Sequence, residues 1–320
     1  MRRYLLAGII FMVSVSFLGQ TSYAQGQTEE PVGRISISGA WALYPMAVKW
    51  AEEFQKVYPG VKIDISAGGA GKGITDALSK VVDLGMVSRE INPQEVQKGI
   101  WSVSVTKDAV VATINANNPS LKDILAKGIT KETFKDIFVT GKIKTWGQAL
   151  KTDASGVINV YTRSDACGAA ETWAKYLGTK QEELMGIGVY GDPGVAEAVK
   201  SDLLAIGFNN INFAYDSKTK AQVEGIRVVP IDVNGDGLIK LDENVYKDLD
   251  TMTAAIAQGR YPSPPARELY MVSNGKPEKK EVLLFLKWVL SDGQKYVPQT
   301  GFIKVSEERI KEDLQKLKGN

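Results

Sequence analysis

The sequence of 320 residues contains no histidine and a single cysteine, Cys167. Without histidine, a Ser-His-Asp triad, a Cys-His pair and a histidine-ligated zinc site are excluded. A hydrolytic enzyme would need a carboxylate, a lysine or an added metal ion instead. With one cysteine, no disulfide bond can form within the chain. We therefore expect a protein that is not an enzyme and that folds without covalent cross-links.

The chain also lacks an excess of charge of either sign. Its 39 Lys and Arg residues nearly balance its 37 Asp and Glu residues, which leaves a formal net charge of +2. A nucleic-acid-binding domain needs clustered positive charge, so we expect no nucleic-acid partner. Long hydrophobic runs are absent after the first residues, and no later stretch is long and apolar enough to be a transmembrane helix.

The N-terminal residues 1–24 have the pattern of a secretory signal peptide. Arg2 and Arg3 precede the apolar run 5–18, and small residues around Ala24 suit a signal peptidase. No cysteine lies near this site, so we expect no lipid anchor. The sequence predicts a soluble periplasmic protein that is cleaved after about Ala24 and has a flexible leader over 25–33.

A glycine-rich turn dominates the stretch 63–86. The strand pattern of 63–65 leads into 67–73, which holds four glycines, and apolar residues at helical spacing follow. Such a strand–turn–helix unit leaves backbone N–H groups unpaired at the positive end of the helix dipole, where an anion binds favourably. It is not a Walker A loop, because no G-K-[ST] follows at the required spacing.

Two further segments, 35–45 and 157–171, repeat this strand–turn–helix plan. Three helix N-termini that meet would enclose an anion with neutral donors and dipoles. The alternative is an ordinary α/β domain with three unrelated turns, and the sequence leaves this choice open.

Four stretches resemble the periplasmic phosphate-binding proteins of ABC transporters, the PstS-type solute receptors. They are Ser38–Pro45, Gly68–Gly71, Val82–Arg89 and Arg163–Gly168, and the resemblance runs from about residue 35 to residue 302. It implies an α/β, two-lobed periplasmic binding protein fold of type II, with the ligand in the cleft between the lobes. Lobe 1 would combine 34–107 with 262–320, and lobe 2 would comprise 108–261.

The resemblance also implies a function. The protein would be a monomeric receptor that captures a small oxyanion, most simply phosphate, by closing its lobes. It would deliver the anion to an ABC permease in the inner membrane. The alternatives are a receptor for a different anion or a small carboxylate, and a calcium-dependent phosphoesterase that uses the same cleft.

The ligand-binding residues implied by the resemblance lie in the three turns and after the strand 82–88. Arg163 would hold two oxyanion oxygens or lie in a structural ion pair, and Arg89 would bind the ligand or bridge the lobes. The full set is Ser38, Ala40, Trp41, Ala42, Leu43, Gly69, Ala70, Gly71, Ser88, Arg89, Arg163, Cys167, Gly168 and Ala169.

Several hydroxyl side chains that are common in this family are replaced here, at Ala40, Ala42, Ala70, Cys167 and Ala169. The identity of the anion is therefore open. Trp41 either covers a larger ligand or packs in the core. Because Cys167 would lie at a helix N-terminus, we expect a lowered pKa for its thiol.

Residues 232–243 match the calcium loop of the EF-hand, D-x-N-x-D-G-x5-E. Gly237 would make the sharp turn, and an ordinary surface turn rich in Asp, Asn and Gly is the alternative. The preceding segment 226–231 has the pattern of a strand, so we predict an EF-like loop that binds a structural Ca²⁺ ion. The ligands would be Asp232, Asn234, Asp236, the carbonyl of Leu238, and Glu243.

The periodic spacing of apolar residues predicts the remaining strands and helices. It predicts a long strand over 101–115 that crosses between the lobes, and a strand that runs through 206–208 into 211–215. Helices are predicted over 46–58, 194–204 and 281–290, with a charged surface helix after Val305.

Overall fold

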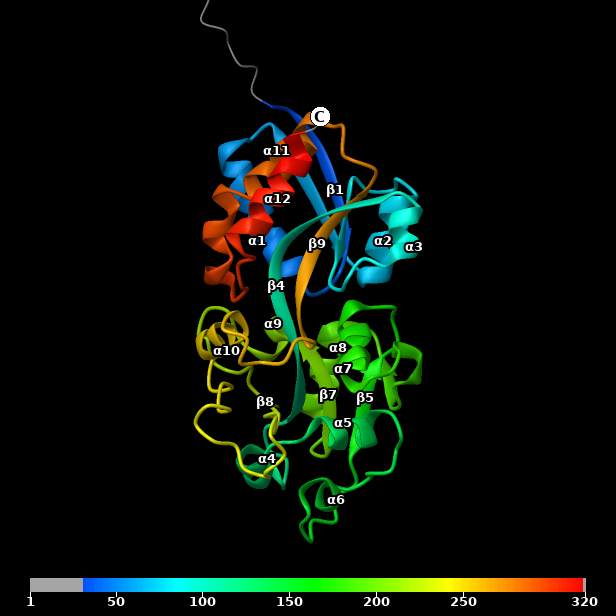
Figure 1. Cartoon of the computed structure of the whole chain (residues 1–320), viewed down its shortest axis with the longest axis vertical. Helices are drawn as coiled ribbons and strands as arrows, with labels where there is room; N and C mark the ends of the chain where they lie inside the picture. The colour runs from blue at the N-terminus through cyan, green and yellow to red at the C-terminus, as the bar shows by residue number, and fades with distance from the viewer. Residues whose placement is uncertain (1–30, 319–320) are drawn as a thin grey trace, which may run out of the picture. The chain divides into compact units, whose positions relative to one another are not determined.

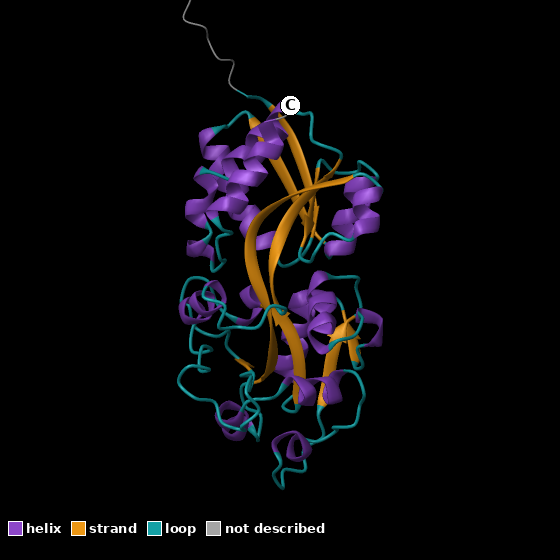
Figure 2. Ribbon diagram, in the orientation of Figure 1, coloured by secondary structure: helices purple, strands orange, loops and turns teal. Residues whose placement is uncertain are grey.

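The structure is a computed structural model that describes residues 31–318 (Figure 1). The predicted signal peptide and the leader up to residue 30 lie outside the described residues. From Pro31 onward the chain forms one compact unit. Its strands form a sheet in the order β2-β1-β3-β9-β4-β7-β5-β6, with β8 paired to β4, and helices cover it (Figure 2).

The strands are β1 (Gly33–Gly39), β2 (Val61–Ala67), β3 (Leu84–Val87), β4 (Ile100–Asn115), β5 (Asn159–Arg163), β6 (Ile187–Val189), β7 (Ala205–Asn210), β8 (Ile226–Val228) and β9 (Ala266–Asn274). The α-helices are α1 (Tyr44–Val57), α2 (Ala70–Leu78), α3 (Pro93–Gln97), α4 (Leu121–Lys127), α5 (Lys131–Phe138), α6 (Trp146–Leu150), α7 (Gly168–Leu177), α8 (Gly191–Ser201), α9 (Ile211–Ala214), α10 (Leu249–Ala257), α11 (Lys280–Val289) and α12 (Glu307–Lys318). No helix of this described part is long and apolar enough to cross a membrane.

Buried apolar side chains form two large clusters and a small one. One large cluster surrounds β1, β2 and β3 and also takes in Val105 and Leu269. The other begins at Ala109, surrounds β7 and includes Ala266 and Ile303. We call these clusters, with the elements around them, lobe 1 and lobe 2. The predicted lobe boundaries stay a prediction, because Ala266 and Ile303, predicted for lobe 1, belong to the cluster of lobe 2.

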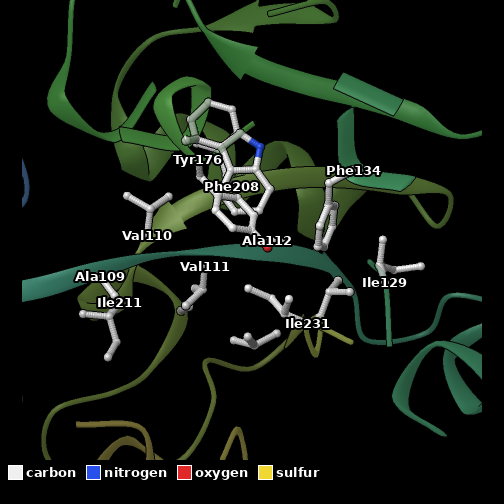
Figure 3. Packing of buried hydrophobic residues seen from close by; sticks show 14 of the residues in the cluster. Ala109, Val110, Val111, Ala112, Ile129, Phe134, Tyr176, Phe208, Ile211 and Ile231 are labelled. Carbon is white, nitrogen blue, oxygen red and sulfur yellow. The ribbon is translucent and has the colours of Figure 1, made fainter. Parts of the chain in front are cut away.

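Two strands, β4 and β9, join the lobes (Figure 1). They pair with each other in antiparallel fashion from Ile100 to Ala109, and β4 then pairs with β7 and β8 in lobe 2. Within lobe 2, Ala109 and Val111 lie on one side of β4, and Val110 lies on the other beside Phe208 (Figure 3). Because both faces of β4 are covered in lobe 2, residues 109–112 are all apolar instead of alternating with polar residues.

Helix α1 shows how the sequence specifies a covering helix. Its buried residues are spaced three or four apart, as one face of a helix requires, and Pro45 stands in the first turn, where no N–H is needed. The helix ends at Tyr58, just before Pro59 and Gly60. The predicted helix over 46–58 is therefore confirmed to within two residues.

Two strand predictions are wrong in part. Strand β7 ends at Asn210, and 211–214 form the short helix α9, because the backbone N–H and side chain of Asn210 bind Asp192 and end the strand pairing. Strand β8 covers only 226–228 of the predicted 226–231. Pro230 lies in the remainder and has no N–H to give to a ladder.

A buried ion pair lies where β4 and β9 pass between the lobes. Nε of Arg267 lies 2.8 Å from Oδ1 of Asp108, and both side chains are almost fully buried. Arg267 also donates to Asn210, Thr172 and the carbonyl of Gly168. Burial raises the pKa of Asp108, and Arg267 opposes that shift.

We predict that Arg267→Met lowers the free energy of unfolding by roughly 3–5 kcal/mol near neutral pH, because Asp108 then stays buried without its partner. The raised pKa means that folded Asp108 holds its proton more readily than the unfolded chain does. Stability is therefore lost as the pH rises from the pKa of Asp108 in the unfolded chain to its raised pKa in the folded protein. The loss of stability in Arg267→Met should accordingly be smaller in mild acid. Urea denaturation at two pH values measures it. The control is Arg34→Met, which breaks the exposed pair with Asp64 and should change stability little.

Candidate functional site

The predicted turns lie at the carboxyl ends of strands β1, β2 and β5. We call Gly39–Leu43 turn 1, Ala67–Gly71 turn 2 and Arg163–Ala169 turn 3. Strands β1 and β2 are parallel with Gly39 beside Ala67, and β1 and β3 are parallel with Gly39 beside Met86. Parallel pairing brings the carboxyl ends of the strands, and the helix N-termini that follow, to one edge of the sheet.

Contacts between the turns show that they converge. The N–H groups of Gly68 and Gly69 donate to the carbonyl of Gly39 at 2.9 and 3.1 Å, which joins turn 2 to turn 1. Across the lobes, the N–H of Gly71 donates to the carbonyl of Ala166 at 3.2 Å. A side chain at Gly168 would collide with Ser88 after β3. The three turns therefore converge, which the sequence alone left open.

Backbone donors remain unpaired where the turns meet. Within residues 31–318, no acceptor lies within hydrogen-bond distance of the N–H groups of Trp41, Ala42, Ala70, Gly168 and Ala169. These are first-turn positions or positions just before a helix, where no intrahelical partner exists. The N-terminal ends of helices α1, α2 and α7, which are the positive ends of their dipoles, adjoin the place where the three turns meet. The arrangement offers neutral hydrogen-bond donors to an anion.

Arg163 ends β5 at the start of turn 3, and its side chain has no exposed surface. Its Nε and Nη2 donate to the two carboxylate oxygens of Asp165 at 2.7 and 2.6 Å, and Nη1 donates to Asp192 at 2.7 Å. Burial alone would lower the pKa of Arg163, but the facing Asp192 and Asp165 carboxylates outweigh it and raise the pKa. Two of the five guanidinium N–H groups have no acceptor in the described chain, so Arg163 makes the structural ion pairs and keeps two donors.

The residues that fix Arg163 were not among those predicted from the sequence. Asp192 lies in the first turn of α8 and also accepts from Asn210. Asp165 also accepts from the N–H of Gly191 at 3.2 Å, and its carbonyl accepts from Gln181. A signal for Asp165 was present, because 163–165 reads Arg-Ser-Asp shortly before a helix, but the partner on α8 is remote in sequence.

Some predicted residues have other partners in the structure. The hydroxyl of Ser38 donates to Asp76 at 2.6 Å, which ties β1 to α2. Arg89 makes the bridging contact, because it pairs with Glu95 in lobe 1 and its Nε lies 2.7 Å from Glu171 in lobe 2. Arg89 and Glu171 also line a cavity of about 770 Å³ between the lobes beside β9.

The remaining residues of turn 1 are apolar. Ala40, Ala42 and Leu43 are almost completely buried, and Leu43 precedes the first residue of α1. Trp41 is only partly buried and meets the ring of Tyr190 edge to face, with 6.1 Å between centroids. Turn 1 thus contacts lobe 2 through Trp41.

The predicted calcium loop lies on lobe 2. Carboxylate oxygens of Asp232, Asp236 and Glu243 all lie within 4.8 Å of one another. The oxygens of Asp232 accept from the N–H groups of Gly235 and Gly237, and Glu243 accepts from Val233. The loop therefore gathers hard oxygen ligands of the kind that Ca²⁺ prefers.

The loop is fixed to its lobe at both ends. The N–H of Asp232 donates to the carbonyl of Ile129, and the N–H of Ile239 donates to that of Ala126. The side chain of Ile239 lies against Gly128, where a Cβ would collide with it. An ion in this loop would therefore fasten it to the segment that follows α4.

The predicted lowering of the Cys167 pKa is wrong. Its sulfur accepts from the N–H of Ala170 at 3.4 Å, so the thiol caps α7 as a serine would. Burial raises the pKa of Cys167 to about 12, and the nearby Arg163 does not offset it. The helix N-terminus is outweighed because the thiol is almost inaccessible to water.

We predict that Cys167 resists alkylation in the native protein. With its pKa near 12, almost no thiolate is present at mildly alkaline pH, and the thiolate is the reactive form. Iodoacetamide labelling followed by mass spectrometry should be slow for the folded protein and rapid in guanidinium chloride. Equal labelling rates in both conditions would contradict the assigned burial.

Comparisons with known proteins agree with this architecture. Residues 24–293 match the family described as the PBP superfamily domain. The phosphate-binding protein PstS of Bacillus subtilis is 28% identical over 91% of this chain and 86% of its own length. PstS of Methanocaldococcus jannaschii is 25% identical over 90% of this chain and 86% of its own length.

A solved structure has the same overall architecture as this chain. A substrate-binding protein from Clostridium perfringens, crystallised with bound phosphate, is 25% identical and superposes with a TM-score of 0.70. The match covers 86% of this chain and 100% of the other. The predicted fold class, an α/β periplasmic binding protein of type II, is confirmed, and the chain belongs to the PBP superfamily.

Proposed function

We propose that this protein is an exported receptor that captures a small oxyanion, most simply phosphate, for an ABC transporter. The observation that carries the proposal is the group of unpaired backbone N–H donors at turns 1, 2 and 3, the last of which begins at the buried Arg163. Donors that are fixed in place and neutral bind an oxyanion without the cost of desolvating a second full charge.

The family supports phosphate as the ligand. Both PstS relatives carry the name phosphate-binding protein, and the Clostridium perfringens structure contains phosphate. The missing hydroxyls at Ala70, Cys167 and Ala169 leave the backbone N–H groups to carry the recognition. Each hydrogen bond to a charged ligand contributes roughly 1.5–3 kcal/mol, so a few such groups suffice for binding.

The mechanism is closure of lobe 2 onto lobe 1. Turns 1 and 2 belong to lobe 1, turn 3 belongs to lobe 2, and only a closed cleft brings their donors within reach of one ligand. Strands β4 and β9 would act as the hinge. We further propose that the receptor works as a monomer outside the inner membrane and passes its ligand to a permease, as expected for relatives of ABC-transporter receptors.

We predict that Ala70→Pro weakens phosphate binding at least about 10-fold while the fold is kept, because it removes one N–H donor from the site. Ala70 is the first residue of α2, the helix position that proline tolerates best, and Gly69 before it (φ +93°, ψ 160°) lies outside the α region that a following proline disfavours. Isothermal titration calorimetry measures the affinity. Lys280→Pro, at the exposed first position of α11, is the matched control and should bind as the wild type does.

A parallel titration of sulfate, arsenate, molybdate and small carboxylates identifies the ligand. Tight phosphate binding by the wild type, lost in Ala70→Pro, supports the proposal. Binding of a carboxylate with no response to any oxyanion would assign the cleft to another ligand. Turnover of a phosphoester with calcium would instead indicate the enzyme alternative.

We also propose that the loop 232–243 binds one structural Ca²⁺ ion. Its supports are the match at all five specified positions of the EF-hand pattern and the convergence of three carboxylates, with Asp232 almost fully buried. Asp232, Asn234, Asp236, Glu243 and the Leu238 carbonyl would hold the ion. The ion would supply positive charge that offsets the repulsion among the carboxylates, and it would have no part in anion binding.

We predict that millimolar calcium raises the melting temperature and that a chelator lowers it, because an ion that binds only the folded state stabilises it by mass action. Differential scanning calorimetry measures the shift. Glu243→Gln should abolish the response, whereas Glu308→Gln on α12 should leave it intact. A melting temperature that ignores calcium in the wild type would refute the site.

A further inference from the structure

The indole N–H of Trp41 is buried and has no acceptor in the described chain. Leaving a buried donor without a partner costs roughly 1–3 kcal/mol relative to a donor that is hydrogen-bonded. A native protein bears such a cost where a ligand or a water molecule completes the bond. The surroundings of this N–H therefore indicate whether a ligand or a water molecule accepts its hydrogen bond.

The ring of Trp41 extends from turn 1 to the wall of lobe 2. Its atoms Cε2 and Cζ2 lie 3.3 and 3.4 Å from the place where a Cβ of Gly191 would stand. The indole nitrogen is bonded to Cε2, so it lies on the edge of the ring that faces α8. The N–H of Gly191 in turn donates to Asp165, the partner of Arg163. The Trp41 ring is thus linked to the Arg163 cluster through Gly191 and Asp165.

The other tryptophans show that this environment is distinct. The indole N–H of Trp50 donates to the carbonyl of Gly293 at 2.9 Å. Those of Trp146 and Trp173 also lack an acceptor, but both rings are fully buried inside the apolar cluster of lobe 2. Trp41 is only partly buried, belongs to turn 1 with the unpaired N–H of Ala42, and touches lobe 2 through Tyr190 and Gly191, so separation of the lobes would expose its indole N–H.

We propose that the indole N–H of Trp41 donates a hydrogen bond to the bound oxyanion and takes the place of the hydroxyl donors that this chain lacks. This inference rests on the proposed function. A hydroxyl both donates and accepts, whereas an indole N–H only donates. Trp41 therefore selects a ligand that presents an unprotonated oxygen at this wall. Because the ring spans the lobes, the bond forms only on closure.

The test removes the indole N–H of residue 41 and keeps the shape of the side chain. Benzothienylalanine, an isostere in which sulfur replaces the indole N–H, is introduced at position 41 by genetic code expansion, and Trp41→Phe provides a second variant. We expect phosphate affinity to fall roughly 10- to 100-fold in both, the loss expected for one hydrogen bond to a charged ligand. The matched control carries the same isostere at position 173 and should bind phosphate as the wild type does.

Proton NMR gives an independent readout. On addition of phosphate, the indole N–H resonance of Trp41 should move downfield while that of Trp173 stays in place. Wild-type affinity in the position 41 isostere, or an unmoved Trp41 resonance with phosphate bound, would overturn the inference and leave the receptor function standing. A wild type that binds no oxyanion would overturn both.

Discussion

The site depends on one buried charge, the guanidinium of Arg163. A buried guanidinium is stable only when carboxylates pair with it, and here one carboxylate comes from turn 3 and the other from α8. These pairs fix the end of β5 against the start of α8 and lock the side chain in one rotamer. The three groups carry a local formal charge of +1 − 2 = −1. Attraction for an anion must then come from elsewhere.

The backbone supplies that attraction, and it needs close approach between segments. Gly168 allows turn 3 to lie against Ser88, and Gly191, at a φ of +73°, allows Trp41 to lie against α8. An alanine at Gly191 would be strained and would meet the indole ring. Small residues in these turns thus serve both the N–H geometry and the contact between the lobes.

Much of this could be predicted from the sequence, because it depends on local patterns. The apolar spacing of 46–58 identified α1, and the motifs at 38–45 and 163–168 identified the fold. The partner of Arg163 could not be predicted, because Asp192 is 29 residues away and only the pairing of β5 with β6 brings it near. The strand predicted over 211–215 is wrong for the same reason. The alternation of apolar and polar residues could not show that the carboxylate of Asp192 accepts hydrogen bonds from Asn210. The pKa of Cys167 was predicted from the helix dipole, and burial, which the sequence does not show, outweighed it.

Recognition by neutral backbone groups has a kinetic consequence. A cationic pocket draws anions in over several ångströms, and dissolved salt screens that pull. Here the two carboxylates of Asp165 and Asp192 outnumber the guanidinium of Arg163, and amide dipoles act only at short range. Ligand capture should therefore proceed at the pace of ordinary diffusion, almost indifferent to ionic strength. For the exported receptor proposed above, this constancy would let uptake track the concentration of the ligand alone.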